Sequence, residues 1–333
     1  KPDILTFVST GHFNFRLTKQ NGALRRARDT VRLHLMHFLL VLAGAAAALL
    51  LVNFALAYYG AGMLIYPPYM SPMTFFPERF GVKYEKVSFP SKDGLTLSGW
   101  FVPSASGGDR TILICHGWGD NKGEILEQTL FLNRAEGFNL FYFDFRAHGE
   151  SEGKQVTMGK MELLDFAAAV DYLRKNRPRH AANLSVFGVS MGAAVAAMAL
   201  PGYPEIKAAV LESPFADFRE VGSRWAWHHA RVPYFPVMMT LMYVARLRSG
   251  HADLDRYSPE AYLPSAKTPV FIIAAERDGI MPPEDVRRLY ASAPEPKEFW
   301  LVPGAVHAKC RQAAPADYDA RVAAFLRAHL STS

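Results

Sequence analysis

From residue 84 onwards, short apolar segments typical of buried β-strands alternate with segments of helical periodicity. The predicted strands cover residues 84–89, 95–102, 111–115, 139–143, 183–188, 207–213, 269–275 and 298–304. The helical patterns include residues 123–136, residues 161–175 and a segment rich in small residues that ends at Leu200. Strands that alternate with helices indicate an α/β fold, in which a mostly parallel sheet is covered by helices on both faces.

The predicted strand at 183–188 leads directly into the sequence GVSMG, in which Ser190 lies between two glycines. A sharp turn from strand to helix would leave the serine hydroxyl exposed above the sheet. Such a turn requires Gly188 and Gly192, because side chains there would collide with the neighbouring backbone. The G-x-S-x-G motif also occurs by chance, and an ordinary strand-to-helix turn is the alternative. The position between a buried strand and a helix favours Ser190 as a nucleophile.

A nucleophilic serine needs a base, and the base needs an acid that orients it. Among the 11 histidines, His307 is the expected base, because it follows the last predicted strand in a loop that can reach the turn at Ser190. Asp278 follows the strand at 269–275 at the same edge of the sheet, and it is the expected acid. Glu212, at the end of the strand at 207–213, is the alternative acid.

Acyl transfer also requires two backbone N–H groups that bind the oxyanion of the tetrahedral intermediate. One expected donor is the N–H of Met191, directly after the candidate nucleophile. The other is the N–H of Trp118 in the sequence HGWG, where Gly117 and Gly119 allow the backbone to approach a substrate closely. A glycine-rich loop without a catalytic role is the alternative for this segment.

Together these motifs resemble those of serine hydrolases of the α/β-hydrolase superfamily, over about residues 80–330. The segments that carry the resemblance are HGWG (116–119), DFRAHGESEG (144–153), GVSMG (188–192), AERDGIMP (275–282) and GAVH (304–307). In the second of them, Ala147 and His148 stand where the superfamily usually has a glycine and a variable residue.

The resemblance implies a triad in the chain order Ser190, Asp278, His307, without a metal or another cofactor. It implies a hydrolase that acts through an acyl-enzyme on a carboxylic ester or thioester of a lipid or another small acyl substrate. The chain order and the motifs leave two alternatives open. One is an acyltransferase that uses the same triad, and the other is a tethered binding protein without turnover.

About 45 residues, from 214 to 258, occupy the place where the superfamily inserts a lid over its site. The apolar members of this insertion are Trp225, Trp227, Tyr234, Phe235, Met238, Met239, Leu241, Met242 and Tyr243. A mobile apolar cover would suit a lipid or an acyl chain, and ordinary packing against the sheet is the alternative. His228 and His229 lack a spaced third ligand, so no metal site is predicted.

Ahead of this domain, residues 33–77 contain no charged side chain, and residues 35–59 are almost wholly apolar. A helix of that length would cross a bilayer, although a cleaved signal peptide and a buried core helix are alternatives. The basic segment 1–34 then predicts a cytoplasmic N-terminus and a catalytic domain on the other side of the membrane. Residues 60–78, which contain Pro67, Pro68, Pro72 and Pro77, are expected to form an extended stalk before a domain at 79–333.

The formal net charge of +6 does not indicate nucleic-acid binding, because residues 1–34 carry seven Lys or Arg against two Asp. No basic stripe remains on the main domain to follow a phosphate backbone. The only two cysteines, Cys115 and Cys310, exclude a disulfide framework. Whether these two cysteines pair is left open by the sequence.

Overall fold

The computed structural model describes residues 10–66, 71–230, 234–251, 253 and 256–330. The chain divides into two compact units, residues 1–55 and residues 56–333. The described part of the first unit belongs to helix α1 (Thr10–Ile65), which ends inside the second unit. One segment of α1, Gly22–Ile65, is long and apolar enough to cross a membrane.

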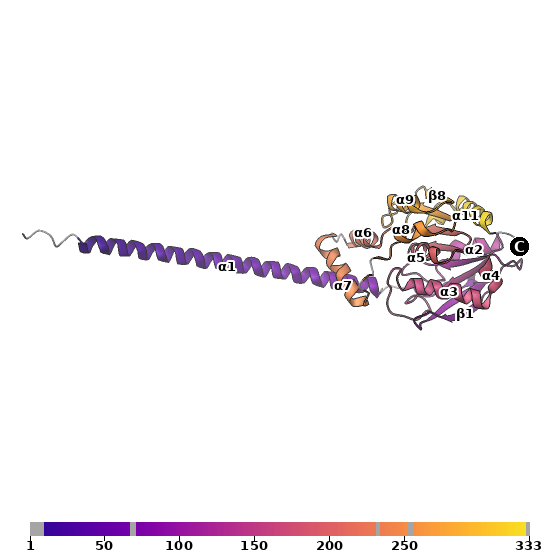
Figure 1. Cartoon of the computed structure of the whole chain (residues 1–333), viewed down its shortest axis with the longest axis horizontal. Coiled ribbons are helices and arrows are strands. Elements are labelled where there is room, and N and C mark those ends of the chain that lie inside the picture. Colours follow the sequence, from indigo (N-terminus) through magenta and orange to yellow (C-terminus); the bar gives the residue numbers. More distant parts are fainter. Residues whose placement is uncertain (1–9, 67–70, 231–233, 252, 254–255, 331–333) are drawn as a thin grey trace, which may run out of the picture. The chain divides into compact units, whose positions relative to one another are not determined.

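A sheet of eight strands forms the centre of the second unit (Figure 1). The strands are β1 (Glu85–Pro90), β2 (Thr96–Val102), β3 (Thr111–Cys115), β4 (Asn139–Phe143), β5 (Leu184–Val189), β6 (Ala209–Glu212), β7 (Val270–Ala275) and β8 (Lys297–Val302). Their order across the sheet is β1-β2-β4-β3-β5-β6-β7-β8. Strand β2 pairs antiparallel with β1 and β4, and all other pairs are parallel. The predicted α/β fold and its strands are therefore confirmed.

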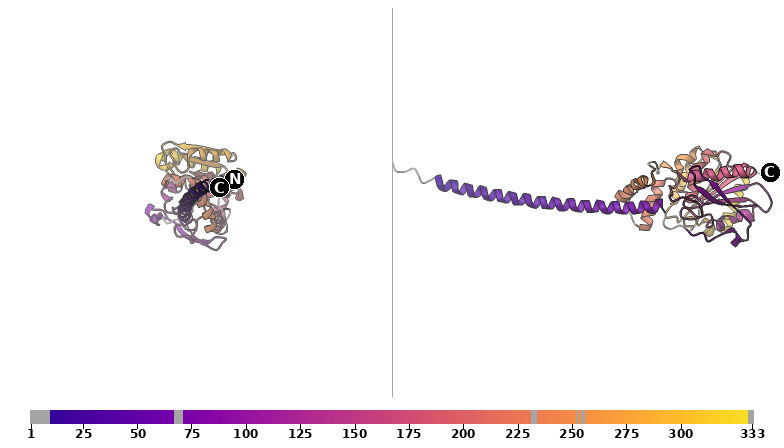
Figure 2. Two further views of the ribbon diagram at one scale, coloured as in Figure 1. Left: turned by 90° about the vertical axis from the view of Figure 1, so that its left-hand side faces the viewer. Right: turned by 90° about the horizontal axis from the view of Figure 1, so that it is seen from below.

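Helices cover both faces of this sheet (Figures 1 and 2). One face is covered by α3 (Glu162–Asn176), α5 (Met191–Ala199) and α9 (Pro283–Ser292), and the other by α2 (Leu126–Arg134) and α11 (Pro315–His329). The shorter helical segments are η1 (Pro77–Phe80) before β1, α10 (Cys310–Ala313) after β8, and, between strands, α4 (Pro178–Ala182), η2 (Leu200–Gly202), α8 (Pro259–Tyr262) and η5 (Leu263–Ser265). Every residue of strands β3 to β7 is buried, because helices pack on both sides of them. This burial explains why these strands are continuous apolar runs in the sequence.

The expected insertion at 214–258 contains α6 (Phe218–Ala230), η3 (Tyr234–Met238) and α7 (Met239–Ser249). Its apolar side chains are of two kinds. Met238, Leu241 and Met242 are buried in the core, as the packing alternative expects. Four others are exposed: Trp227, Phe235, Met239 and Tyr243. The side chains of Trp225, His228, His229 and Tyr234 lie outside the part of the chain that the structure describes.

The last turns of α1 differ from the expected extended stalk, because they pack into the second unit. Ala57, Ala61 and Ile65 are fully buried, and the N–H of Val156 donates a hydrogen bond of 2.8 Å to the carbonyl of Ile65. Further along, the N–H of Ser71 donates to the carbonyl of Gly119. The compact unit therefore begins at Leu56 and not at residue 79. Pro67, Pro68 and Tyr69 lie outside the described residues.

Both cysteines are buried free thiols. Cys115 is the last residue of β3 and Cys310 is the first residue of α10. Burial raises the pKa of both thiols. They therefore contribute apolar packing to the core and form no disulfide.

Candidate active site

Ser190 lies at the tight turn between β5 and α5, with φ at 53°. A positive φ is unfavourable for a serine, so the surrounding backbone must hold this conformation. A Cβ at position 192 would lie 2.2 Å from the carbonyl oxygen of Cys115, and a Cβ at position 188 would lie 2.7 Å from the nitrogen of Ala193. Only glycine fits at positions 188 and 192, because a Cβ at either position would collide with backbone atoms of other residues.

His307 lies between Ser190 and Asp278 and is hydrogen-bonded to both. Its Nδ1 is 2.7 Å from Oδ2 of Asp278, and its Nε2 is 2.9 Å from Oγ of Ser190. A carboxylate only accepts hydrogen bonds, so Nδ1 carries the proton in a neutral ring. Nε2 is then the acceptor for the hydroxyl of Ser190, which is the arrangement that proton transfer from this hydroxyl requires.

The carboxylate of Asp278 is held on both of its oxygens. Oδ2 accepts from His307, whereas Oδ1 accepts the N–H groups of Ile280, at 3.0 Å, and Met281, at 2.8 Å. The Asp278 side chain is fully buried, and the side chain of His307 is 23% exposed. The acid is thus shielded from water, while the imidazole remains open to a substrate. The loops of the two residues are also joined, because the N–H of Arg277 donates to the carbonyl of Ala305.

Glu212, the alternative acid, makes no hydrogen bond to His307 among the described contacts. One of its oxygens accepts from the N–H of Cys310 at 3.1 Å, and the other accepts from Tyr318 and Gln128. The side chain is completely buried, and this burial raises the pKa of its carboxyl group. Cys310 follows His307 by three residues, so Glu212 supports the loop that carries His307.

The loop after β3 approaches Ser190 from the side. A Cβ at Gly117 would lie 3.6 Å from Cβ of Ser190, and Gly119 has φ at 79°. Trp118, between these glycines, is half-buried and packs against the core. Met191 is the first residue of α5, and the first N–H groups of a helix have no acceptor within it. The two expected oxyanion donors therefore belong to segments on either side of Ser190.

Two histidines to which the sequence analysis assigned no role support this loop. Nδ1 of His116 is 2.7 Å from the carbonyl of Gly117, and its Nε2 accepts the N–H of Phe145 at 3.0 Å. Nδ1 of His148 is 2.8 Å from the carbonyl of Arg146, and its Nε2 accepts the N–H of Gly119 at 3.1 Å. Each ring donates through Nδ1 and accepts through Nε2, so each is neutral.

Burial lowers the pKa of both rings, which keeps them neutral at physiological pH. A protonated ring could not accept the backbone N–H that each now receives. The sequence does hold a signal for this pair, because His116 and His148 follow β3 and β4, which are adjacent parallel strands. Their ring centroids lie 5.0 Å apart.

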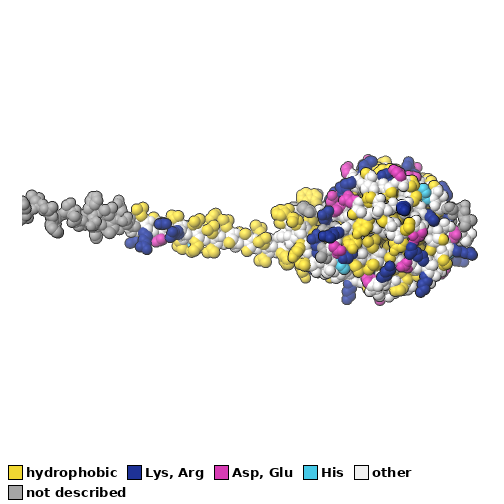
Figure 3. Space-filling model, in the orientation of Figure 1, with side chains coloured by type: hydrophobic (Ala, Val, Ile, Leu, Met, Phe, Trp, Pro, Cys, Tyr) yellow, Lys and Arg dark blue, Asp and Glu magenta, His cyan; other side chains and the backbone are white. Residues whose placement is uncertain are grey.

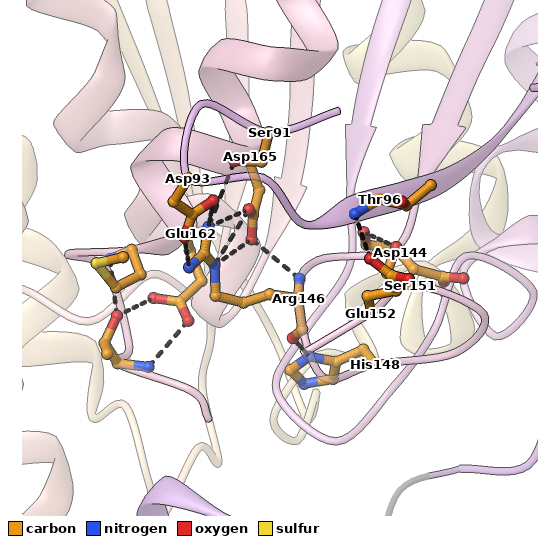
Figure 4. A network of polar contacts seen from close by, with 12 residues as sticks. Ser91, Asp93, Thr96, Asp144, Arg146, His148, Ser151, Glu152, Glu162 and Asp165 are labelled. Atoms are coloured by element: carbon orange, nitrogen blue, oxygen red, sulfur yellow. Dashed lines mark hydrogen bonds and ion pairs between the residues drawn. The ribbon is translucent and has the colours of Figure 1, made fainter. Parts of the chain in front are cut away.

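Arg146 holds the turn that carries His148 (Figure 4). Its guanidinium donates to Asp93 at 2.7 Å and to Asp165 at 2.6 Å. Its backbone N–H also donates to Asp165, at 2.9 Å. Burial raises the pKa of Asp165 to about 6, although the adjacent guanidinium opposes this shift. Ala147, in the position where a glycine is usual, has φ at 58°. The ion pairs therefore hold a strained turn in place, and with it the imidazole of His148.

No group of three or more His, Cys, Asp or Glu side chains in the described ranges could hold a metal ion. The side chains of Ser190, His307 and Asp278 have the hydrogen-bonded arrangement that nucleophilic catalysis by a serine requires.

Comparisons with known proteins agree with this architecture. A family model described as serine aminopeptidase, S33, matches residues 108–245. The chain is 33% identical over 218 residues to the uncharacterised protein Rv2307c of Mycobacterium tuberculosis, across 65% of this chain and 70% of that protein. It is 23% identical over 258 residues to the uncharacterised membrane protein YNL320W of Saccharomyces cerevisiae, across 75% of this chain and 84% of that protein. The solved structure of the Pyrococcus furiosus esterase Pf2001 is similar with a TM-score of 0.68 at 30% identity, across 80% of this chain and 99% of that chain.

Proposed function

The chain belongs to the α/β-hydrolase superfamily and is a hydrolase, and we propose that Ser190, His307 and Asp278 are its catalytic triad, acting on carboxylic esters or thioesters. The observation that carries the proposal is the continuous hydrogen-bonded chain from Oγ of Ser190 through His307 to the buried carboxylate of Asp278. A binding protein that catalyses no reaction would require neither this series of hydrogen bonds nor a serine in a strained backbone conformation.

In the proposed mechanism, Oγ of Ser190 attacks the acyl carbonyl carbon while Nε2 of His307 takes the hydroxyl proton. Asp278 keeps the proton of the ring on Nδ1 and stabilises the imidazolium that forms. The N–H groups of Met191 and Trp118 bind the oxyanion. His307 then gives its proton to the leaving group, and an acyl-enzyme remains on Ser190. Water, activated by His307, attacks this acyl-enzyme and releases the acid and the free serine.

An ester or thioester with a lipid or other acyl group is the proposed substrate class. The Pyrococcus furiosus relative is an esterase, which favours an ester over a peptide. The insertion carries four exposed apolar side chains, Trp227, Phe235, Met239 and Tyr243, and this favours a substrate with an apolar acyl group. The description of the matching family names an aminopeptidase, so hydrolysis of an amide is the alternative activity.

We also propose that α1 anchors the enzyme in a membrane. Its segment Gly22–Ile65 has a mean hydropathy of 2.5 in its most apolar window, and the related yeast protein is called a membrane protein. The basic residues before the apolar segment favour a cytoplasmic N-terminus with the catalytic unit on the opposite side.

The test is a substrate series with the purified full chain in detergent or vesicles. We expect the fluorophosphonate probe to label the wild type, and p-nitrophenyl esters of increasing acyl length to be hydrolysed faster than the matching aminoacyl p-nitroanilides. The expected ratio of kcat/KM between ester and anilide is about 10³ or more. Hydrolysis of the anilides alone would overturn the ester assignment, and a folded wild type that the probe does not label would overturn the triad.

His148 is a positioning residue in this scheme, because it holds Gly119 and thereby the N–H of Trp118. We expect His148→Phe to lower kcat about 10- to 100-fold and to change KM less than about twofold, since loss of a complete oxyanion donor costs about 10²–10³. His148→Gln is the matched control, because its side-chain oxygen can accept from Gly119, and it should recover most of the rate. Steady-state kinetics of the two variants measure both constants. Equal losses in both variants, or a change confined to KM, would contradict this role.

A further inference from the structure

Helix α7 is apolar on both of its faces. Its inner face packs in the core of the second unit through Leu241, Met242, Val244 and Ala245. Its outer face carries Met239, Tyr243 and Leu247, four residues apart, and Phe235 lies before α7 in η3, where its φ and ψ are not helical. These four residues, called here the outer stripe, are 72% (Phe235), 54% (Met239), 60% (Tyr243) and 65% (Leu247) exposed. Exposed apolar side chains that gather in one patch commonly mark an interaction site, so the outer stripe indicates a contact with something apolar.

The contacts of α7 indicate what that apolar partner is. The guanidinium of Arg248 donates to the carbonyl of Tyr58 at 2.8 Å and lies 4.2 Å from the centre of its ring. A Cβ at Gly60 would lie 2.6 Å from Cδ1 of Leu241, so α1 and α7 are in close contact at this glycine. Along α1, the apolar segment 35–55 precedes the residues that make these contacts. Helix α7 is therefore attached to the turns of α1 that follow the apolar segment 35–55.

The length of the span places this contact at a membrane surface. Residues 35–55 have no charged side chain and precede the second unit. About 20 helical residues cross the hydrocarbon core, so this segment suffices without the turns that contact α7. Tyr58 and Tyr59, which are exposed, then fall at the level where aromatic side chains are enriched. Because Arg248 binds Tyr58, α7 lies near the same level.

We propose that the outer stripe of α7 inserts into the interface of the bilayer that α1 spans, so that the catalytic unit meets its substrates at the lipid surface. This inference rests on the proposed anchoring by α1 and narrows the proposed substrates to esters that partition into membranes. Helix α7 contains two arginines, Arg246 and Arg248, and no acidic residue, as is typical of helices that bind lipid surfaces. Hydrophobic side chains are prominent at the end of the unit that carries α7 (Figure 3).

Depth-dependent quenching tests the insertion directly. The full chain is reconstituted in vesicles of phosphatidylcholine and phosphatidylglycerol, and a nitrobenzoxadiazole group is attached in Leu247→Cys. The native cysteines are buried and do not compete for the label. Lys175→Cys, at an exposed position near the end of α3, is the matched control. We expect lipids with a doxyl quencher to quench the Leu247 label at least about threefold more than the Lys175 label, and iodide in the water to do the reverse.

A label at Leu247 that iodide quenches as well as the Lys175 label would overturn the proposal. Protection of the label from both quenchers, together with a disulfide between two chains of the unlabelled Leu247→Cys variant, would overturn it in favour of a contact between two copies. Flotation of the vesicles is measured before any quenching. Wild type that does not float with the vesicles would disprove the anchoring by α1.

Activity gives a second readout. We expect Leu247→Glu to lower kcat/KM at least about tenfold for an ester lipid in vesicles, and less than about twofold for p-nitrophenyl acetate in water. Lys175→Glu, the control for added negative charge, should change neither rate. Equal losses on both substrates would overturn the role in docking. If the wild type hydrolyses neither substrate, the proposed function fails, whereas the quenching experiment still decides whether the stripe is inserted.

Discussion

Ser190→Ala is expected to lower kcat for ester hydrolysis by about 10⁵-fold or more and to abolish labelling by a fluorophosphonate. The variant removes one oxygen, which is the atom that forms the bond to the acyl carbon in the proposed mechanism. His307 and Asp278 keep their hydrogen bond, but they have no hydroxyl to activate. The residual rate should come from binding and the oxyanion donors alone. Initial rates with a p-nitrophenyl ester and gel fluorescence after labelling measure the two effects.

Ser213→Ala is the matched control for this experiment. Ser213 directly follows β6, is buried, and also has a positive φ, at 48°. Alanine at this position shows how the same substitution affects stability and rate in a similar backbone conformation, because the side chain of Ser213 has no proposed catalytic role. We expect this variant to retain kcat within about threefold and both variants to unfold within about 2 °C of wild type. Substantial turnover in Ser190→Ala, or labelling of a different residue, would contradict the assignment of the nucleophile.

The sheet could be predicted because burial on two faces leaves a strong pattern in the sequence. Strands β3 to β7 have no exposed residue, so each is a mostly apolar run next to a helical pattern. Their parallel arrangement then brings the carboxyl ends of β5 and β7 to one edge, where Ser190 and Asp278 follow. The order of the chain along the sheet is a tertiary property, and no local pattern contains it.

Other features depend on contacts that no single segment reveals. Residues 33–65 of α1 contain no charged side chain, and nothing in this pattern separates the turns that would face lipid from Ala57, Ala61 and Ile65, which are buried in the second unit. The stalk was expected from its prolines, yet the chain around Ser71 is bonded to Gly119 in the catalytic unit. In the same way, the positions of His116 and His148 relative to each other depend on the pairing of the strands that precede them. Contacts between distant segments decide each of these cases.

Asp278→Asn is expected to lower kcat about 10⁴-fold, as the corresponding substitution does in serine proteases. The amide of asparagine would present an N–H₂ group or a weaker oxygen to Nδ1 of His307. Where the amide donates, the ring proton moves to Nε2, which can then no longer accept the hydroxyl of Ser190. The backbone donors Ile280 and Met281 can still be satisfied by the asparagine oxygen, so the loop should remain folded. Steady-state rates and thermal unfolding separate the loss of chemistry from a loss of structure.

Glu212→Gln decides between the two acids that the sequence allowed. Glutamine retains an oxygen for the N–H of Cys310, and it removes a carboxylate whose burial already raises its pKa. We therefore expect kcat to fall less than about tenfold and the free energy of unfolding to change by about 1 kcal/mol or less. If Glu212→Gln lost as much activity as Asp278→Asn, the carboxylate of Glu212 would have to act on His307 in a conformation other than this one. A small effect, beside the large one at Asp278, would assign orientation of the imidazole to Asp278 and support of its loop to Glu212.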